Sequence, residues 1–145
     1  MNFNIPHSYK VTANAIKDKT YKVSAENLPI IETAPPKNFG GPGNIWSPED
    51  LFVATIANCF LMTFKAVSTL SKLDWLSLDV NAEGILDRVD SKLQFTEVII
   101  KAFLKIPKDG NEERAIRIMH KAEQNCLVTN SLKTNVTLKP SVIFS

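Results

Sequence analysis

The sequence predicts an α+β fold in which antiparallel sheets wrap around one long, buried central helix. Strand patterns come in runs, three before the first helical segment and two after it, and such runs disfavour a parallel βαβ array. The first helical segment contains fourteen residues, Leu51 to Phe64, without a charge. A helix that is apolar on every side is buried all round. The expected order is three strands, a long helix, two strands, a second helix and a final strand.

Composition indicates one globular domain over residues 1–145, with 44% hydrophobic and 22% charged residues. The net charge of +2 comes from 17 basic and 15 acidic residues without a basic run, so we expect no nucleic-acid partner. The N-terminus lacks a secretory pattern, and the longest apolar run is too short for a bilayer. Two cysteines are too few for a disulfide scaffold. A cytoplasmic protein without a membrane partner is expected.

The N-terminal third reads as short strands followed by a loop. Residues 9–16 and 21–27 alternate apolar and polar side chains with a polar turn, "KDKT", between them. The Pro- and Gly-rich stretch 34–46 predicts a loop. Phe39 and Trp46 within it are candidate pocket walls.

The long helix has a well-defined start in the sequence. Ser47 is the expected N-cap and Pro48 the first helical residue. Glu49 and Asp50 then place negative charge in the first turn, where the helix dipole favours it. The helix is predicted to run to about Lys72.

Three strand patterns follow the long helix. Within residues 75–86 the side chains from Leu76 to Glu83 alternate apolar and polar, and within 95–106 every second residue from Val98 to Ile106 is apolar, so that these residues share a face. The stretch 135–144, "NVTLKPSVIF", closes the chain as a final strand. Together they predict the second group of strands.

A second helix is predicted after the turn at 107–111. Its apolar side chains recur at the spacing of one helical face, and continuing that stripe by four positions reaches Cys126. Both thiols, Cys59 and Cys126, are therefore expected on apolar helix faces. The stripe consists of Ala115, Ile118, Met119 and Ala122.

The charge-free helix also predicts the oligomeric state. About seven short elements from one small chain cannot easily enclose a helix that needs cover on every side. We therefore expect a second copy of the chain to supply part of the cover, in an obligate homodimer.

The motif "GGPGNIWSPEDLFVATIANCF" and the segment "AEQNCLVTNSL" resemble the OsmC/Ohr family of osmotically inducible and organic hydroperoxide resistance proteins. The first is similar to that family's Gly-rich loop, Pro-Glu helix start and first-cysteine helix, and the second to its second-cysteine segment. The order of elements matches across nearly the whole chain. The resemblance implies an intertwined homodimer with two buried central helices wrapped by sheets. It also implies a cysteine-based peroxidase for small organic hydroperoxides, reduced by a thiol or dithiol.

The resemblance also assigns roles to individual residues. It makes Cys59 the thiol that attacks the peroxide, Cys126 the thiol that resolves the sulfenic acid, and Glu49 the carboxylate beside the first thiol. Glu49 and Cys59 are ten residues apart, which is about 15 Å along a helix. If Glu49 serves the Cys59 thiol, it is therefore expected to come from the partner subunit.

An activating cation is expected near Cys59, because desolvation alone disfavours a thiolate. The family's peroxidases carry an arginine near the first β-turn, whereas this turn reads "AIKDKT". Lys17 or Lys19 from that turn is the first candidate, and Arg88 is the alternative. Arg114 and Arg117 are expected to point to solvent.

Other interpretations of these residues remain open. A cysteine in apolar surroundings often acts as an inert hydrophobic residue, so Cys59 and Cys126 need not be reactive. Glu49 would stabilise the helix dipole without any catalytic duty. The alternative function is an OsmC-like dimer that binds a hydrophobic small molecule and has little or no redox activity. His7 and His120 form no metal-ligand pattern, and no metal or cofactor is expected.

Overall fold

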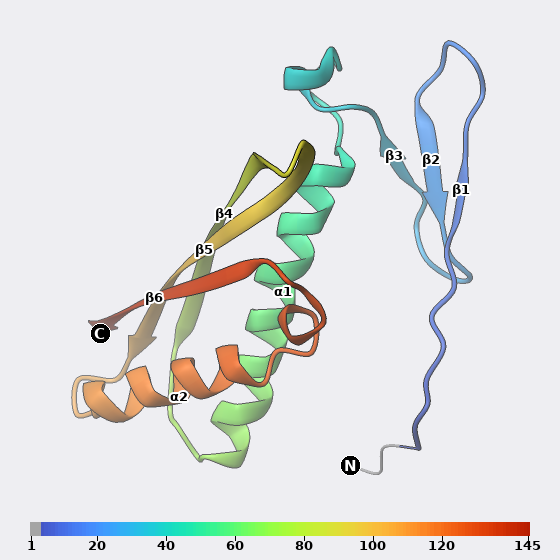
Figure 1. The fold of residues 1–145 in the computed structure, drawn as a ribbon. Helices are drawn as coiled ribbons and strands as arrows, with labels where there is room; N and C mark the ends of the chain where they lie inside the picture. Colours follow the sequence, from blue (N-terminus) through green and yellow to red (C-terminus); the bar gives the residue numbers. More distant parts are fainter. Residues whose placement is uncertain (1–3) are drawn as a thin grey trace. The chain divides into compact units, whose positions relative to one another are not determined.

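A computed structural model describes residues 4–145, and the order of its elements is the predicted one (Figure 1). The chain divides into two compact units, 1–51 and 52–145, with the long helix beginning in the first. The strands are β1 (Thr12–Asn14), β2 (Tyr21–Ser24), β3 (Ile31–Thr33), β4 (Ser77–Val89), β5 (Lys92–Ile106) and β6 (Asn135–Phe144). The helices are α1 (Pro48–Leu70) and α2 (Glu112–Gln124), with short 3-10 turns η1 (Lys37–Phe39) and η2 (Thr129–Ser131).

The first unit contains a three-stranded antiparallel sheet in the order β1-β2-β3. Its strands are shorter than the alternation predicts, and Tyr9 and Val11 lie outside β1 with 89% and 74% of their surfaces exposed. In the turn between β1 and β2, the amide of Lys19 donates to the carbonyl of Ile16 at 3.1 Å. A small sheet that buries so little apolar surface has little stability of its own.

The start of α1 is the predicted one. The Ser47 hydroxyl accepts a hydrogen bond from the Asp50 amide at 3.1 Å. In return the Asp50 carboxylate accepts from the Ser47 amide at 3.2 Å and from its hydroxyl at 2.8 Å. This reciprocal pattern is a capping box, with Pro48 at the first helical position.

One face of α1 is buried and the other is open within the chain. Met62 on the open side is 60% exposed, and Leu70 is 85% exposed. The expectation of burial all round is therefore not met inside a single chain. By length and composition alone α1 could cross a membrane, but the core helix of a soluble protein passes the same test. The buried face comprises Ile56, Phe60, Phe64, Val67 and Ser68.

The second unit contains a three-stranded sheet in the order β4-β5-β6. β4 and β5 are antiparallel, as predicted, but β6 runs parallel to β5, which corrects the expectation of purely antiparallel sheets. The reason is that α2 carries the chain back across the sheet before β6 begins, so β5, α2 and β6 form a βαβ unit. Pro140 fits β6 because β6 is an edge strand.

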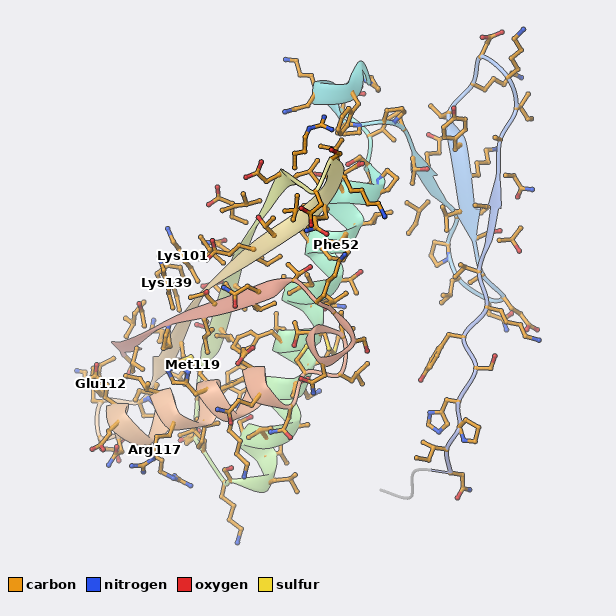
Figure 2. The ribbon with its side chains drawn as sticks, viewed as in Figure 1. Phe52, Lys101, Glu112, Arg117, Met119 and Lys139 are labelled. Atoms are coloured by element: carbon orange, nitrogen blue, oxygen red, sulfur yellow. The ribbon has the colours of Figure 1, made fainter. Side chains whose placement is uncertain are left out.

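The core of the second unit lies between the sheet and the two helices (Figure 1). Alternate side chains of β5 are buried there, together with the predicted apolar stripe of α2. Figure 2 shows Met119 on the side of α2 toward the sheet and Arg117 on the outward side. The buried β5 residues are Val98, Ile100, Ala102, Leu104 and Ile106.

Two contacts fix the direction of β4 relative to α1. Trp75, just before β4, meets Phe64 edge to face with ring centroids 5.3 Å apart. Further along β4, a Cβ at Gly84 would lie 2.6 Å from a methyl carbon of Val53. β4 therefore runs antiparallel to α1, and the strand glycine lets the first half of the helix approach the sheet closely.

Candidate functional site

The fold brings the two thiols together from positions 59 and 126 of the sequence. Cys59 lies in the middle of α1 and is half-buried, whereas Cys126 is fully buried. The Cys59 side chain lies close enough to Cys126 to raise the pKa of the Cys126 thiol. Cys59, the thiol on the central helix, is therefore the more accessible of the two.

Cys126 lies just beyond α2 rather than on the helix itself. Asn125 ends α2, and its side chain donates to the carbonyl of Lys121 at 2.7 Å. After Cys126 the chain turns into η2, where the Thr129 hydroxyl donates to the Cys126 carbonyl at 3.1 Å. The predicted continuation of the apolar stripe is correct in position, although the helix itself has ended.

The environment of Cys126 keeps its thiol protonated. Burial raises the pKa of the Cys126 thiol above its ordinary value of 9.0, and the hydrogen bond with the Cys59 thiol raises it further. The backbone and side chain of Thr129, which lie beside the thiol, lower this pKa and partly offset the rise. The neutral form of the Cys126 thiol is therefore favoured, which suits a thiol that reacts only after Cys59 has been oxidised.

This raised pKa predicts how the stability of the reduced protein depends on pH. Between the unfolded and folded pKa values the folded thiol keeps a proton that the unfolded thiol has lost, so unfolding releases a proton. The free energy of unfolding is therefore expected to fall as pH rises above about 9. Urea unfolding under reducing conditions at a series of pH values checks this. Cys126→Ala should show a shallower decline, and equal slopes in the two proteins would contradict the prediction.

Thr63 contacts the Cys59 thiol and was not singled out from the sequence. Its Oγ1 lies 4.0 Å from the Cys59 Sγ, within the longer range of sulfur hydrogen bonds. The two residues are four positions apart on α1, a spacing that places them on one helix face. That spacing is the signal from which Thr63 could have been found.

Glu49 lies in the first turn of α1 and has a buried carboxylate oxygen. Its Oε2 has no hydrogen-bond partner within residues 4–145. Glu49 also lines a mainly apolar cavity of about 270 Å³ in the first unit, together with Tyr21 and the predicted pocket wall Phe39. A buried carboxylate oxygen is costly without a donor, so this position calls for one from outside the described chain.

The two candidate lysines lie in the first unit. Lys17 and Lys19 are both exposed in the turn between β1 and β2. Lys19 lines a cavity of about 310 Å³ with the Gly-rich loop residues Gly40 and Gly41. The assignment of either lysine as an activating cation stays a prediction.

Arg88 lies near the tip of the β4–β5 hairpin, where its guanidinium donates to the carbonyl of Ser91 at 3.3 Å. Taking the Gly84–Val53 contact as reference, Arg88 is about 13 Å further along β4. Cys59 is about 9 Å from the same contact along α1 in the opposite direction. Arg88 therefore lies far along the sheet from the Cys59 of its own chain and stays a candidate only from a second copy.

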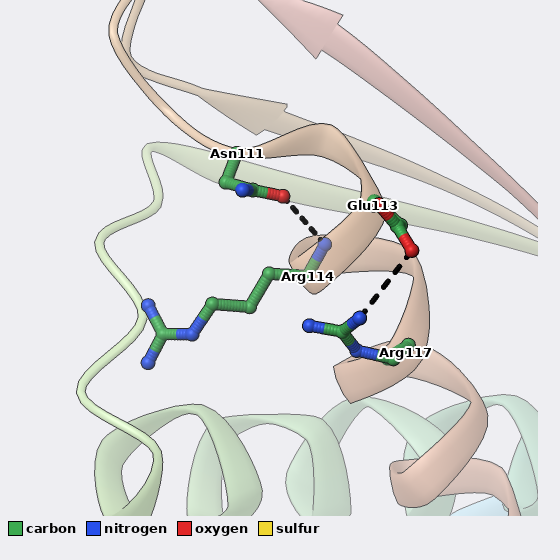
Figure 3. Close-up of polar contacts among 4 residues, drawn as sticks. All are labelled: Asn111, Glu113, Arg114 and Arg117. Atoms are coloured by element: carbon green, nitrogen blue, oxygen red, sulfur yellow. Dashed lines mark hydrogen bonds and ion pairs between the residues drawn. The ribbon is translucent and has the colours of Figure 1, made fainter.

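Both arginines of α2 were expected to point to solvent, and only one of them does (Figure 3). Arg114 was expected to point to solvent, but its guanidinium donates to the carbonyl of Ser71, just after α1. It thereby satisfies a carbonyl that the end of the helix leaves free. Its own amide is capped by Asn111 at 2.8 Å. Arg117 is exposed as expected and makes a surface ion pair with Glu113 at 3.4 Å.

Comparison with known proteins places the chain in a family. The model of the OsmC-like protein family matches residues 41–141, which include Glu49, Cys59 and Cys126. The match covers more than half of the sequence. The chain belongs to the OsmC-like protein family.

Named relatives and similar solved structures agree with the assignment to this family. Over 93 residues the chain is 30% identical to Peroxiredoxin OsmC of Escherichia coli, covering 63% of this chain and 64% of that protein. An organic hydroperoxide resistance protein OsmC from Legionella pneumophila is 26% identical, with a TM-score of 0.74 and coverage of 94% and 98%. An OsmC-like protein of unknown function from Vibrio cholerae has a TM-score of 0.84 at 18% identity, covering 94% and 100%. The α+β fold is thus that of the family.

Proposed function

We propose that the protein is a cytoplasmic thiol peroxidase that reduces small organic hydroperoxides. The observation that carries the proposal is the proximity of the Cys59 and Cys126 side chains, which are far apart in the sequence. The names of the Escherichia coli and Legionella pneumophila relatives support a redox role. The half-buried Cys59 is the thiol that a peroxide would reach, and the buried Cys126 is the one that follows.

The chemistry balances with these two groups and an external reductant. The Cys59 thiolate attacks the terminal peroxide oxygen, so that an S–O bond forms, the O–O bond breaks and the alcohol leaves with a proton. The resulting sulfenic acid then reacts with the Cys126 thiol to form an S–S bond and release water. A thiol or dithiol reductant restores both thiols, so that one hydroperoxide is reduced for each two thiols oxidised.

The proposed assembly is a homodimer in which a second copy completes the site. Two features support it: the open apolar side of α1, which includes Met62, and the buried Glu49 oxygen without a donor among residues 4–145. Glu49 and Cys59 of one chain are ten residues apart on α1, too far for one side chain to join them. A Glu49 from the partner would serve Cys59, with a lysine or Arg88 as its cation.

The proposal predicts the product of oxidation by one equivalent of cumene hydroperoxide. The reduced protein should lose two hydrogens by intact mass spectrometry, and peptide mapping should join Cys59 to Cys126. Under the same conditions Cys126→Ser should instead gain one oxygen at Cys59. An unchanged wild-type mass would contradict a peroxidase and favour the hydrophobic-ligand-binding dimer.

A further inference from the structure

We propose that Thr63 is a positioning residue for the reactive sulfur, donating a hydrogen bond from its hydroxyl to the Cys59 thiolate. The inference rests on the proposed function in taking Cys59 as the thiol that attacks the peroxide. It adds a hydrogen-bond donor from α1 itself to the groups already proposed to act on the Cys59 sulfur, which are Glu49 and a cation.

The hydroxyl of Thr63 differs from that of another threonine on the same helix. A threonine inside a helix commonly donates to the carbonyl four residues earlier. Thr69 does so, with its Oγ1 2.8 Å from the carbonyl of Lys65. The Thr63 hydroxyl instead lies 4.0 Å from the Cys59 Sγ, which is its side-chain partner among the described residues. The Thr63 proton is therefore available to the sulfur.

The geometry suits the charged form of Cys59 better than the neutral form. A hydrogen bond to an ionised acceptor is shorter and stronger than one between neutral groups. When Cys59 ionises, a small rotation of the Thr63 side chain would shorten the contact and aim the proton at the sulfur. The half-buried setting strengthens the bond, since less water competes for it.

Among residues 4–145, the other ionisable groups of these helices do not supply this donor. Cys126, from the segment after α2, lies near the Cys59 thiol and has a raised pKa. Lys65 of α1 and Lys121 of α2 are exposed. The acids of the first turn of α1, Glu49 and Asp50, lie ten and nine positions before Cys59 and are acceptors rather than donors. A hydroxyl one turn along the same helix is thus the donor that the described contacts provide.

The test compares Thr63→Val, which keeps the shape but removes the hydroxyl, with Thr63→Ser, which keeps the hydroxyl. The rate of Cys59 alkylation by iodoacetamide is followed against pH, with the modified cysteine identified by peptide mass spectrometry. Thr63→Val should slow Cys59 alkylation by about tenfold near neutral pH, as expected for one lost hydrogen bond to the charged form. Thr63→Ser should restore the wild-type profile. The matched control, Thr69→Val, removes a hydroxyl that bonds only a helix carbonyl and should leave the profile unchanged.

Two outcomes would overturn the inference: a Thr63→Val profile equal to that of the wild type, or a Thr63→Ser profile equal to that of Thr63→Val. Consumption of cumene hydroperoxide by the wild-type protein is measured in parallel. If the wild type consumes the peroxide and the profiles coincide, the inference fails while the proposed function stands. If the wild type consumes none and Thr63→Val still shifts the profile, the proposed function fails and the hydrogen bond to the thiolate stands.

Discussion

Replacing Cys59 by serine is expected to abolish hydroperoxide reduction. A serine hydroxyl at this position is a far weaker nucleophile than a thiolate. The steady-state rate with cumene hydroperoxide and a dithiol reductant should fall on the order of 1,000-fold or more, to the rate without enzyme. Peroxide consumption followed in a coupled or colorimetric assay measures it.

Cys126→Ser is the matched control for this loss, because it changes the same atom in the neighbouring residue. This variant should retain the first, fast reaction with peroxide and fail at later turnovers, with Cys59 progressing to the sulfinic acid when peroxide is in excess. A Cys59→Ser protein that still turns over at the wild-type rate would remove Cys59 from the mechanism. Wild-type steady-state activity in both variants would argue against any role for the pair.

Replacing Met62 by glutamate is expected to dissociate the proposed dimer. Met62 is 60% exposed on the open side of α1 in a single chain. If a second copy covers that side, each dimer would bury two carboxylates without partners, at a cost on the order of 4 kcal/mol or more. The dissociation constant should then rise about 1,000-fold. Sedimentation velocity or light scattering across a concentration series measures it.

His120→Glu is the control, since it places the same charge on an exposed position of α2. That variant should sediment as the wild type does. Because an obligate dimer has no stable folded monomer, circular dichroism of the Met62 variant should show loss of helical signal at the concentrations where it dissociates. A wild-type protein that is a folded, cooperative monomer at micromolar concentration would contradict the dimer itself.

Much of the fold could be predicted from local patterns in the sequence. The period-two patterns within 75–86 and 95–106 predicted β4 and β5, and the capping residues predicted the start of α1 at Pro48. These signals are strong because each depends on neighbours within a few residues. The parallel pairing of β6 was missed because alternation indicates a strand but carries no information on its direction.

The burial of α1 shows a second limit of sequence patterns. Its apolar composition predicts cover on every side, but composition does not say which chain provides that cover. Arg114 shows the same limit at a smaller scale, because its carbonyl partner at Ser71 is 43 positions away and no local pattern joins them.

The candidate site was only partly accessible from the sequence. Cys59, Cys126 and Glu49 were found through the resemblance to a family, whereas their spacing alone leaves inert roles open. The contact between the thiols depends on how α2 and the segment after it pack on α1. Thr63 was accessible through its helical spacing from Cys59, but a threonine in a helix is common and gives no signal without the neighbouring sulfur.

The contact between the middle of α1 and the segment after α2 has a consequence for heat and denaturant resistance. A disulfide there would close a loop of 67 positions that contains β4, β5 and α2. Closing a loop of that length restricts the unfolded chain and stabilises the fold by on the order of 4 kcal/mol in the chain-entropy account. Oxidation would thus raise the free energy of unfolding, and reduction would lower it again. The oxidised form would be the more resistant to heat and denaturant, and the reductant would return the protein to its less stable state.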